Sequence, residues 1–169
     1  MNEGEIKQKL WNLFSNYDYR LFNVFVFQNE SDFLAVSKSG YVWEIEIKVS
    51  RADFKNDFKK MDRGGKNKHE KLQSGKGLKP NKFCFAVPNK LISVKEVPDY
   101  AGLIYFYKGG SGKIIKRPKF LHKDNLFNNN YFLKQMLNKF YFRHTNLRIA
   151  LDYKEWELKY KQGRLPFYS

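Results

Sequence analysis

The chain has 169 residues, which is enough for one domain with a substantial hydrophobic core. Its 32 Lys and Arg residues exceed its 17 Asp and Glu residues by 15. The expected partner is therefore a polyanion, with nucleic acid ahead of an anionic membrane surface. The single cysteine excludes an internal disulfide framework and a cysteine-rich zinc site, and no membrane-spanning run or secretory leader is expected.

Hydrophobic spacing predicts a helix over residues 3–14 and then a hairpin-rich segment. Strands are expected over 21–28, 32–37, 41–48, 82–87, 102–107 and 113–116. Ser50 is a plausible N-cap for a helix over 51–61, and the glycine- and lysine-rich stretch 62–80 is expected to be a long basic loop. From Asp124 onward, leucines at helical spacing predict one helix and a possible second. This order indicates an α/β protein with a C-terminal helical addition.

The charge surplus is unevenly distributed along the chain. Residues 1–48 contain 5 basic and 7 acidic residues, a net charge of −2, whereas residues 49–169 contain 27 and 10, a net charge of +17. An acidic segment is thus followed directly by a basic one, and the change falls at Glu46-Ile47-Lys48.

Three charged residues on one predicted strand share a face. Glu44, Glu46 and Lys48 are two residues apart and project to the same side. A tight turn at Ser39-Gly40 would place residue 32 near residue 47, so that Asp32 comes within one step of Glu46. Two carboxylates in hydrated surroundings suit Mg²⁺, and a lysine beside the metal can orient a water or stabilise developing phosphate charge. The pattern predicts metal-assisted phosphodiester hydrolysis.

Asp32 followed by Glu46-Ile47-Lys48 resembles the D…(D/E)-x-K signature of the PD-(D/E)XK nuclease superfamily. The longer run from Glu44 to Phe54 resembles the E-x-E-I-K-x-S-x-x-D-F segment of its MmcB-like DNA-repair and phage subgroup. The similarity covers about residues 2–107. It implies a restriction-endonuclease-like αβββαβ core with a mixed central sheet over residues 1–120, and a helical extension packed on it over 121–169.

The resemblance also implies roles for individual residues. Asp32 and Glu46 would bind Mg²⁺ or Mn²⁺, the carbonyl of Ile47 would be a further ligand, and Lys48 would be the catalytic lysine. A carboxylate from the first helix often joins such sites; Glu3 fits by its facing, and Glu5 is the runner-up. The residues expected to bind nucleic acid are Ser50, Arg51, Lys55, Lys59, Lys60, Arg63, Lys66, Lys68, His69 and Lys71.

The activity implied is that of a metal-dependent DNA endonuclease or nickase, structure-directed and acting in DNA repair, recombination or phage DNA processing. Its setting would be the cytoplasm of a bacterial cell or a phage-infected host, without membrane attachment. Because many nucleases of this fold act as dimers, a homodimer is left open. The alternative is a non-catalytic nucleic-acid-binding protein that retains the fold.

Several residues also have plainer interpretations. Glu44 is more often a salt-bridging neighbour than a ligand, and a loop histidine such as His69 is usually exposed. Asp53, Asp57 and Lys60 share one side of the second helix, where they would either line the cleft or form an intrahelical charge network.

Overall fold

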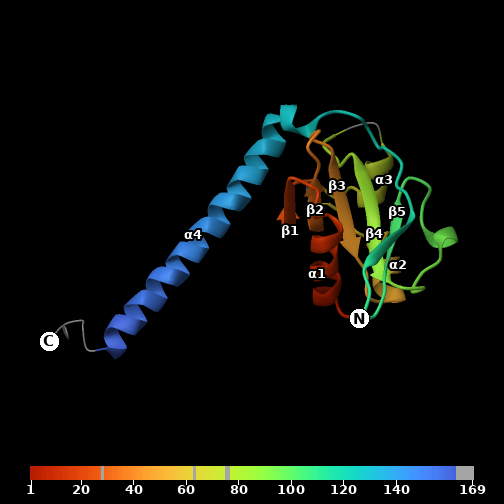
Figure 1. Cartoon of the computed structure of the whole chain (residues 1–169). Helices are drawn as coiled ribbons and strands as arrows, with labels where there is room; N and C mark the ends of the chain where they lie inside the picture. The colour runs from red at the N-terminus through yellow and green to blue at the C-terminus, as the bar shows by residue number, and fades with distance from the viewer. Residues whose placement is uncertain (28, 63, 75–76, 163–169) are drawn as a thin grey trace.

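The computed structural model describes residues 1–27, 29–62, 64–74 and 77–162. A six-stranded mixed sheet carries helices on both faces, and a long helix leaves the domain at its C-terminal end (Figure 1). The elements are α1 (Glu3–Leu13), β1 (Tyr19–Phe25), β2 (Glu30–Val36), β3 (Val42–Ile47), α2 (Arg51–Asp57), α3 (Lys68–Gln73), β4 (Lys82–Pro88), the short 3₁₀ helix η1 (Val94–Glu96), β5 (Gly102–Phe106), β6 (Gly112–Lys116), a second 3₁₀ helix η2 (Leu126–Asn128) and α4 (Asn130–Lys161).

The strands lie in sequence order, β1 to β6, across the sheet. The first three form an antiparallel meander, β4 and β5 run parallel to β3, and β6 returns antiparallel to β5. A parallel β3–β4 pair needs a crossover connection, and α2 and α3 belong to it. The α/β class and the mixed sheet expected from the sequence are therefore confirmed, whereas the order of the strands across the sheet was not predicted.

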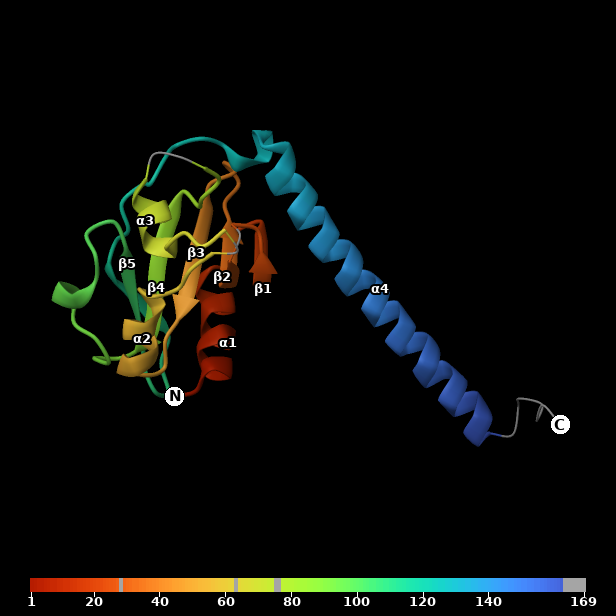
Figure 2. The ribbon, with the colours of Figure 1, turned by 180° about the vertical axis from the view of Figure 1, so that it is seen from behind.

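Alternation along β3 separates its apolar and charged side chains. Ile45 and Ile47 pack in one core cluster with Ile6 and Leu10 of α1. Glu46 projects to the other face, where α2 and α3 lie (Figures 1 and 2). Every residue of β3 is buried, so its acidic side chains lie beneath these helices and not in open solvent.

The β2–β3 turn fixes the register of the charged residues. The backbone N–H of Ser37 donates to the carbonyl of Tyr41 at 2.9 Å, and Gly40 adopts φ +78°, which a residue with a side chain rarely does. The strands pair Phe33 with Ile45, so one step further brings Asp32 opposite Glu46. The expected register, with residue 32 opposite 47, was wrong by one residue, and the observed one brings the two acids closer.

The crossover differs from the sequence expectation. Helix α2 ends at Asp57 and not at 61, and the expected basic loop contains α3. Asn67 caps α3, since its side-chain oxygen accepts from the backbone N–H groups of His69 and Glu70 at 2.9 and 3.2 Å. The sequence analysis predicted a loop here because the stretch is rich in glycine and lysine, and the N-cap residue Asn67 was given less weight than that composition.

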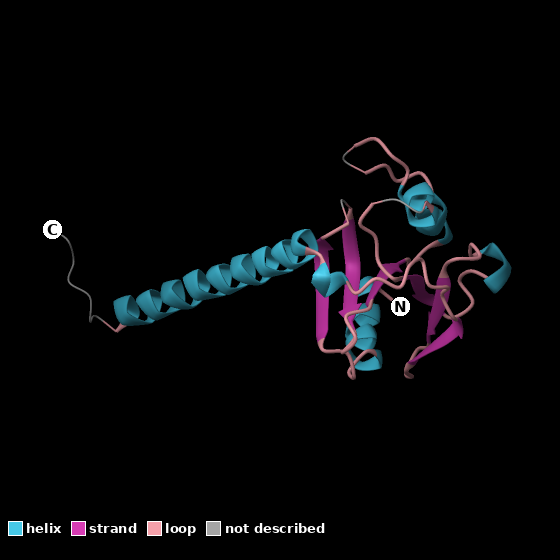
Figure 3. Cartoon of the chain, turned by 90° about the horizontal axis from the view of Figure 1, so that it is seen from above, coloured by secondary structure: helices cyan, strands magenta, loops and turns pink. Residues whose placement is uncertain are grey.

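The C-terminal region also differs. A single 32-residue helix, α4, replaces the two that the sequence left open. Only Phe132 and Met136 of this helix are buried, against residues of β1 and β2, and the rest extends away from the sheet (Figure 3). The extension is thus packed on the core only at its start. No helix in the described ranges is long and apolar enough to cross a membrane.

Candidate active site

Glu46 lies at the centre of a buried cluster of acids and lysines. Its Oε2 lies 2.9 Å from the Nζ of Lys48 and 3.1 Å from that of Lys60, and its Oε1 lies 2.5 Å from the Nζ of Lys68. Glu46 is fully buried and Lys48 is 2% exposed, whereas the side chain of Lys60 is 42% exposed. Lys60 is therefore the one of the three lysines that reaches solvent.

Asp57, the last residue of α2, extends the cluster toward α3. Its Oδ1 lies 2.7 Å from the Nζ of Lys48 and 2.9 Å from that of Lys60. Its Oδ2 lies 2.8 Å from the Nε2 of His69, whose Nδ1 lies 2.5 Å from the hydroxyl of Tyr100. Asp57 thus fixes the ammonium group of Lys48 against Glu46, and His69 fixes Asp57.

Glu44 forms the inner end of the cluster. Its Oε1 accepts from the hydroxyl of Ser31 at 2.9 Å and lies 2.9 Å from the Nζ of Lys68. Its Oε2 is buried without a hydrogen-bond partner among the described residues. Glu44 therefore behaves mainly as the salt-bridging neighbour that its position suggested.

The cluster holds Glu46 and Lys48 in their charged forms. Burial by itself would raise the pKa of Glu46, but Lys68, Lys48 and Lys60 lower that pKa below its ordinary value. Burial would lower the pKa of Lys48, but Glu46 and Asp57 raise that pKa above its ordinary value. Lys48 is consequently an ammonium group at neutral pH. It can donate to a water or a phosphate oxygen, but it cannot accept the proton of an attacking water.

Asp32 is the acid of the site whose negative charge is least compensated by nearby cations. Its Oδ2 accepts from the backbone N–H of Ile47 at 2.8 Å, and it makes no ion pair with any lysine or arginine that the structure describes. Burial, followed by the charge of Glu46, raises the pKa of Asp32 to about 6. Lys48 and Lys60 oppose this shift only from a distance.

This raised pKa makes the stability of the protein depend on pH. Because the pKa of Asp32 is higher in the folded state, its contribution to stability is complete below the unfolded pKa of about 4 and is lost as the pH rises through 6. Asp32→Asn keeps an acceptor for Ile47 and removes this titration. In urea unfolding with EDTA present, the free energy of unfolding of the variant relative to that of the wild type should rise by about 1 kcal/mol between pH 5 and pH 8. If the difference in unfolding free energy between the two proteins were the same at pH 5 and pH 8, the buried environment assigned to Asp32 would be contradicted.

The charges of the cluster suit an additional cation. Asp32, Glu44, Glu46 and Asp57 carry four negative charges, against three positive charges on the lysines, which leaves one negative charge. If a divalent cation replaced the exposed ammonium of Lys60, four positive charges would balance the four carboxylates. In the described part of the chain, no three Asp, Glu, His or Cys side chains group closely enough to hold a metal. The site would offer Asp32, Glu46 and a backbone carbonyl, with water completing the shell.

The first-helix acids lie apart from this cluster. Glu3 is exposed, and its Oε1 lies 2.6 Å from the Nζ of Lys7. Glu5 accepts from the backbone N–H of Asn2 at 2.9 Å in a capping box. Helix α1 covers the face of the sheet opposite Glu46, and neither acid makes an ion pair with the cluster in the described structure.

The predicted nucleic-acid contacts fall into two groups. Exposed side chains are those of Ser50, Arg51, Lys55, Lys59, Lys60 and Lys66. Arg51 is engaged by Glu96 and by the carbonyl of Leu91. Lys68 and His69 were expected at the surface and are buried, because both pair with acids beneath α3. Lys71 is half-buried, and Arg63 lies outside the described residues.

Sequence reasoning missed the inner partners of the site. Tyr100 and the buried role of Lys68 were not predicted. Asp57 and Lys60 were expected either to line the cleft or to form an intrahelical charge network, and Lys60 was also expected to bind nucleic acid, but neither was predicted to contact Lys48 or Glu46. The usable signal was Asn67 followed by Glu70 three residues later, since that pattern predicts a helix start and a fixed position for Lys68 and His69.

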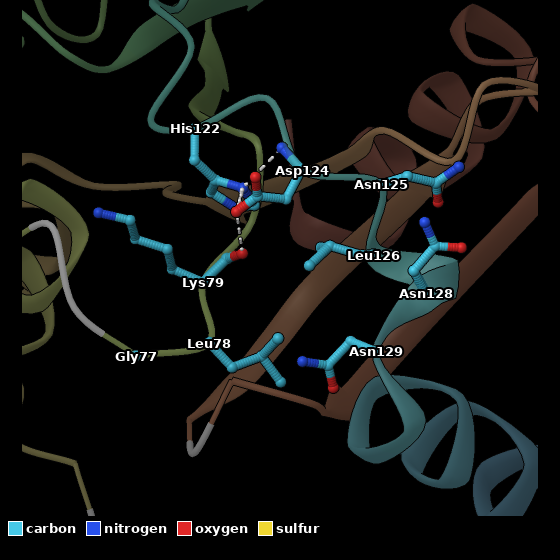
Figure 4. A pocket seen from close by; sticks show the side chains of 9 residues that line it. All are labelled: Gly77, Leu78, Lys79, His122, Asp124, Asn125, Leu126, Asn128 and Asn129. Atoms are coloured by element: carbon cyan, nitrogen blue, oxygen red, sulfur yellow. Dashed lines mark hydrogen bonds and ion pairs between the residues drawn. The ribbon is translucent and has the colours of Figure 1, made fainter.

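A pocket apart from this cluster lies where the chain passes into α4. This pocket of about 310 Å³ lies between residues 77–79 and 122–129, and its rim carries the amides of Asn125, Asn128 and Asn129 (Figure 4). The Nε2 of His122 lies 2.9 Å from the carbonyl of Lys79 across it. None of its lining residues belongs to the acid–lysine cluster.

Comparison with known proteins gives the fold but no activity. No protein-family model matches the chain, and no curated protein matches it. A solved structure described as "SPO1766 protein of unknown function from Silicibacter pomeroyi" is similar, with a TM-score of 0.62 and 16% sequence identity. The match covers 88% of this chain and 92% of that one, so the two proteins share an overall fold.

Proposed function

We propose that the protein is a metal-dependent DNA endonuclease or nickase of the PD-(D/E)XK type. The observation that supports this most directly is the site around β3. Asp32 lies opposite Glu46 on adjacent strands, and the ammonium of Lys48 lies 2.9 Å from Glu46. Two carboxylates suit a divalent cation and a neighbouring ammonium suits developing phosphate charge, and their spacing resembles that of the D…(D/E)-x-K signature.

The order of elements supports the same assignment. One helix, a three-stranded antiparallel meander, a helical crossover and a parallel fourth strand follow one another from α1 to β4. This is the arrangement expected of a restriction-endonuclease-like αβββαβ core. Helix α3 is an addition within its crossover, and β5 and β6 extend the sheet beyond it.

In this proposal Asp32, Glu46 and the carbonyl of Ile47 hold Mg²⁺ or Mn²⁺. The cation supplies the activation of a water and the stabilisation of charge on the phosphate. The chain's own contribution is electrostatic: Lys48, kept charged by Glu46 and Asp57, donates to the water or to a phosphate oxygen. Lys60 is the lysine of the three whose side chain is exposed, so it is the one that would give up its contact with Glu46 to a cation held there.

The charge of the surroundings supports DNA as the substrate. Residues 51–82 carry 11 basic and 4 acidic residues. The side chains of Lys55, Lys59 and Lys66 are exposed beside the crossover that carries the site. Phosphate contacts of this kind are independent of sequence. In this proposal the protein therefore recognises the sugar-phosphate backbone and the structure of the DNA. The setting proposed for this activity is the cytoplasm of a bacterial cell or of a phage-infected host.

A panel of linear, nicked, branched and single-stranded DNAs tests this proposal. We expect cleavage in Mg²⁺ or Mn²⁺ and none in EDTA, with loss of cleavage in Glu46→Ala. Cleavage that persists in Glu46→Ala would overturn the assignment of the site. Absence of cleavage on every DNA, despite divalent-ion binding, would overturn the assignment of the activity.

One observation favours a second function, that of a non-catalytic DNA-binding protein. Both oxygens of Glu46 are already engaged by lysines, which is the pairing expected of a site that holds no metal. A binder of this kind would lose affinity steeply as salt rises and would be indifferent to Mg²⁺ and to Lys48→Ala. Fluorescence anisotropy titrations with and without Mg²⁺ separate the two functions.

A further inference from the structure

Helix α4 presents an unusually apolar surface to solvent. The helix leaves the core after Met136, and residues 137–161 extend for about 37 Å (Figures 1 and 3). Leu147 and Leu151 are 65% and 64% exposed. Other large apolar side chains exposed on this segment are Leu137, Phe140, Tyr141, Phe142, Ile149, Tyr153, Trp156, Leu158 and Tyr160. A helix this apolar is usually covered by another element.

One stripe of α4 repeats at the spacing of a coiled coil. Steps of four and three residues connect Leu133, Leu137, Phe140, His144, Leu147, Leu151, Lys154 and Leu158. Six of these eight positions are apolar. They form a seam, the line of a and d positions along which two coiled-coil helices pack, and it runs over three heptads. Leu133 packs on the core, so the free part of the seam begins at Leu137.

The flanking charges decide how two such helices would be oriented. The positions beside the seam are basic in the first half, at Arg143 and Arg148, and acidic in the second half, at Glu155 and Glu157. A parallel pair would place Arg143 beside Arg148 of the other helix and Lys154 against its own copy. An antiparallel pair centred between Leu147 and Leu151 places Arg143 beside Glu157 at both ends, faces Lys154 with His144, and places Arg148 beside its own copy once, at the centre. Two opposite-charge contacts and one like-charge contact compare with two Arg143–Arg148 contacts in the parallel pair, so the charge pattern favours the antiparallel direction.

We propose that α4 is a dimerisation element and that its occupant is a second copy of this chain. In the antiparallel pair, Leu147 of one copy packs against Leu151 of the other, and Phe140 packs against Leu158. Arg143, which also donates to the carbonyl of Phe22, retains donors for Glu157 of the second copy. This inference concerns a surface remote from Glu46, so it stands independently of the proposed nuclease activity.

A second apolar stripe provides the matched control. Phe142, Ile149 and Trp156 are seven residues apart and lie on the side of α4 away from the seam. Ile149 is 62% exposed, close to the exposure of Leu147. The same polar substitution at these two positions differs only in which face of the helix it alters.

Sedimentation velocity of the full chain tests the dimer. We expect a particle of twice the 20.2 kDa chain mass at micromolar concentration. Leu147→Glu should raise the dissociation constant about 100-fold or more, whereas Ile149→Glu should leave it near the wild-type value. A monomeric wild-type chain would overturn the proposal. So would a dimer that survives Leu147→Glu or dissociates equally with Ile149→Glu, because another face or partner would then cover the helix.

Disulfide crosslinking tests the orientation without weakening the seam by charge. Phe140 and Leu158 are about 27 Å apart on one helix, so cysteines there cannot bond within a chain. The only native cysteine, Cys84, is buried and does not compete. Phe140→Cys with Leu158→Cys should form a covalent dimer on mild oxidation, and Leu158→Cys alone should not. Crosslinking by Leu158→Cys alone, or none by the double variant, would contradict the antiparallel arrangement.

Discussion

Replacing Lys68 with alanine is expected to lower the free energy of unfolding by about 3–5 kcal/mol. Lys68 is 3% exposed, and its ammonium lies 2.9 Å from Glu44 and 2.5 Å from Glu46. Among the residues that the structure describes, Glu44 would then keep only the hydroxyl of Ser31 as a partner, and the Oε1 of Glu46 would lose the one cation that it contacts. Two buried carboxylates would then be incompletely compensated, which is among the most destabilising changes a protein core can undergo.

Urea unfolding at neutral pH measures this loss, and Lys66→Ala is the matched control. Lys66 is exposed two residues earlier, and its backbone N–H, not its side chain, donates to Asp62. Its substitution should change the unfolding free energy by no more than about 0.5 kcal/mol. Equal effects of the two substitutions would show that Lys68 is not held in the buried cluster.

The second large effect is expected in catalysis. Lys48→Met preserves the length of a side chain that is 2% exposed but removes its charge. Cleavage in Mg²⁺ should fall by about 100- to 1,000-fold or more, because this buried ammonium, held by Glu46 and Asp57, is the donor that the proposal assigns to the attacking water or a phosphate oxygen. Single-turnover cleavage of the preferred substrate from the DNA panel measures this loss.

Two controls separate catalysis from folding and from DNA binding. Lys59→Met removes an exposed charge from the same crossover and should weaken DNA binding without reducing the single-turnover rate at saturating enzyme. The near-ultraviolet circular dichroism of Lys48→Met should match that of the wild type. A folded Lys48→Met variant that cleaves at the wild-type rate would remove Lys48 from the mechanism.

The local pattern of the sequence was sufficient to place the residues of β2 and β3 in the candidate site. Alternation on β3 and the short turn before it brought Asp32, Glu46 and Lys48 to one sheet face, because strand periodicity and turn length restrict the geometry directly. The one-residue error in register came from the exact closure of the turn around Gly40. That closure depends on backbone angles that the residue types do not specify alone.

The inner part of the site depends on tertiary packing. Lys68 and His69 reach Glu46 and Asp57 only because α3 folds back over β3, and Tyr100 enters from the connection before β5. Lysines in a glycine-rich stretch are ordinarily solvated, so local sequence favoured a surface loop. The course of α4 likewise follows from long-range contacts, since its apolar contacts with the core are made at its start, by Phe132, Leu133 and Met136.

The most direct test of the central claim is the position of a divalent ion. Crystals of the protein soaked in Mn²⁺ should show an anomalous difference peak between the carboxylates of Asp32 and Glu46, with the side chain of Lys60 displaced from Glu46. Wild-type crystals with that peak, and Asp32→Asn crystals without it, would agree with a metal-dependent hydrolase. Saturating Mn²⁺ with no peak there, and with Lys60 still within hydrogen-bonding distance of Glu46, would contradict it.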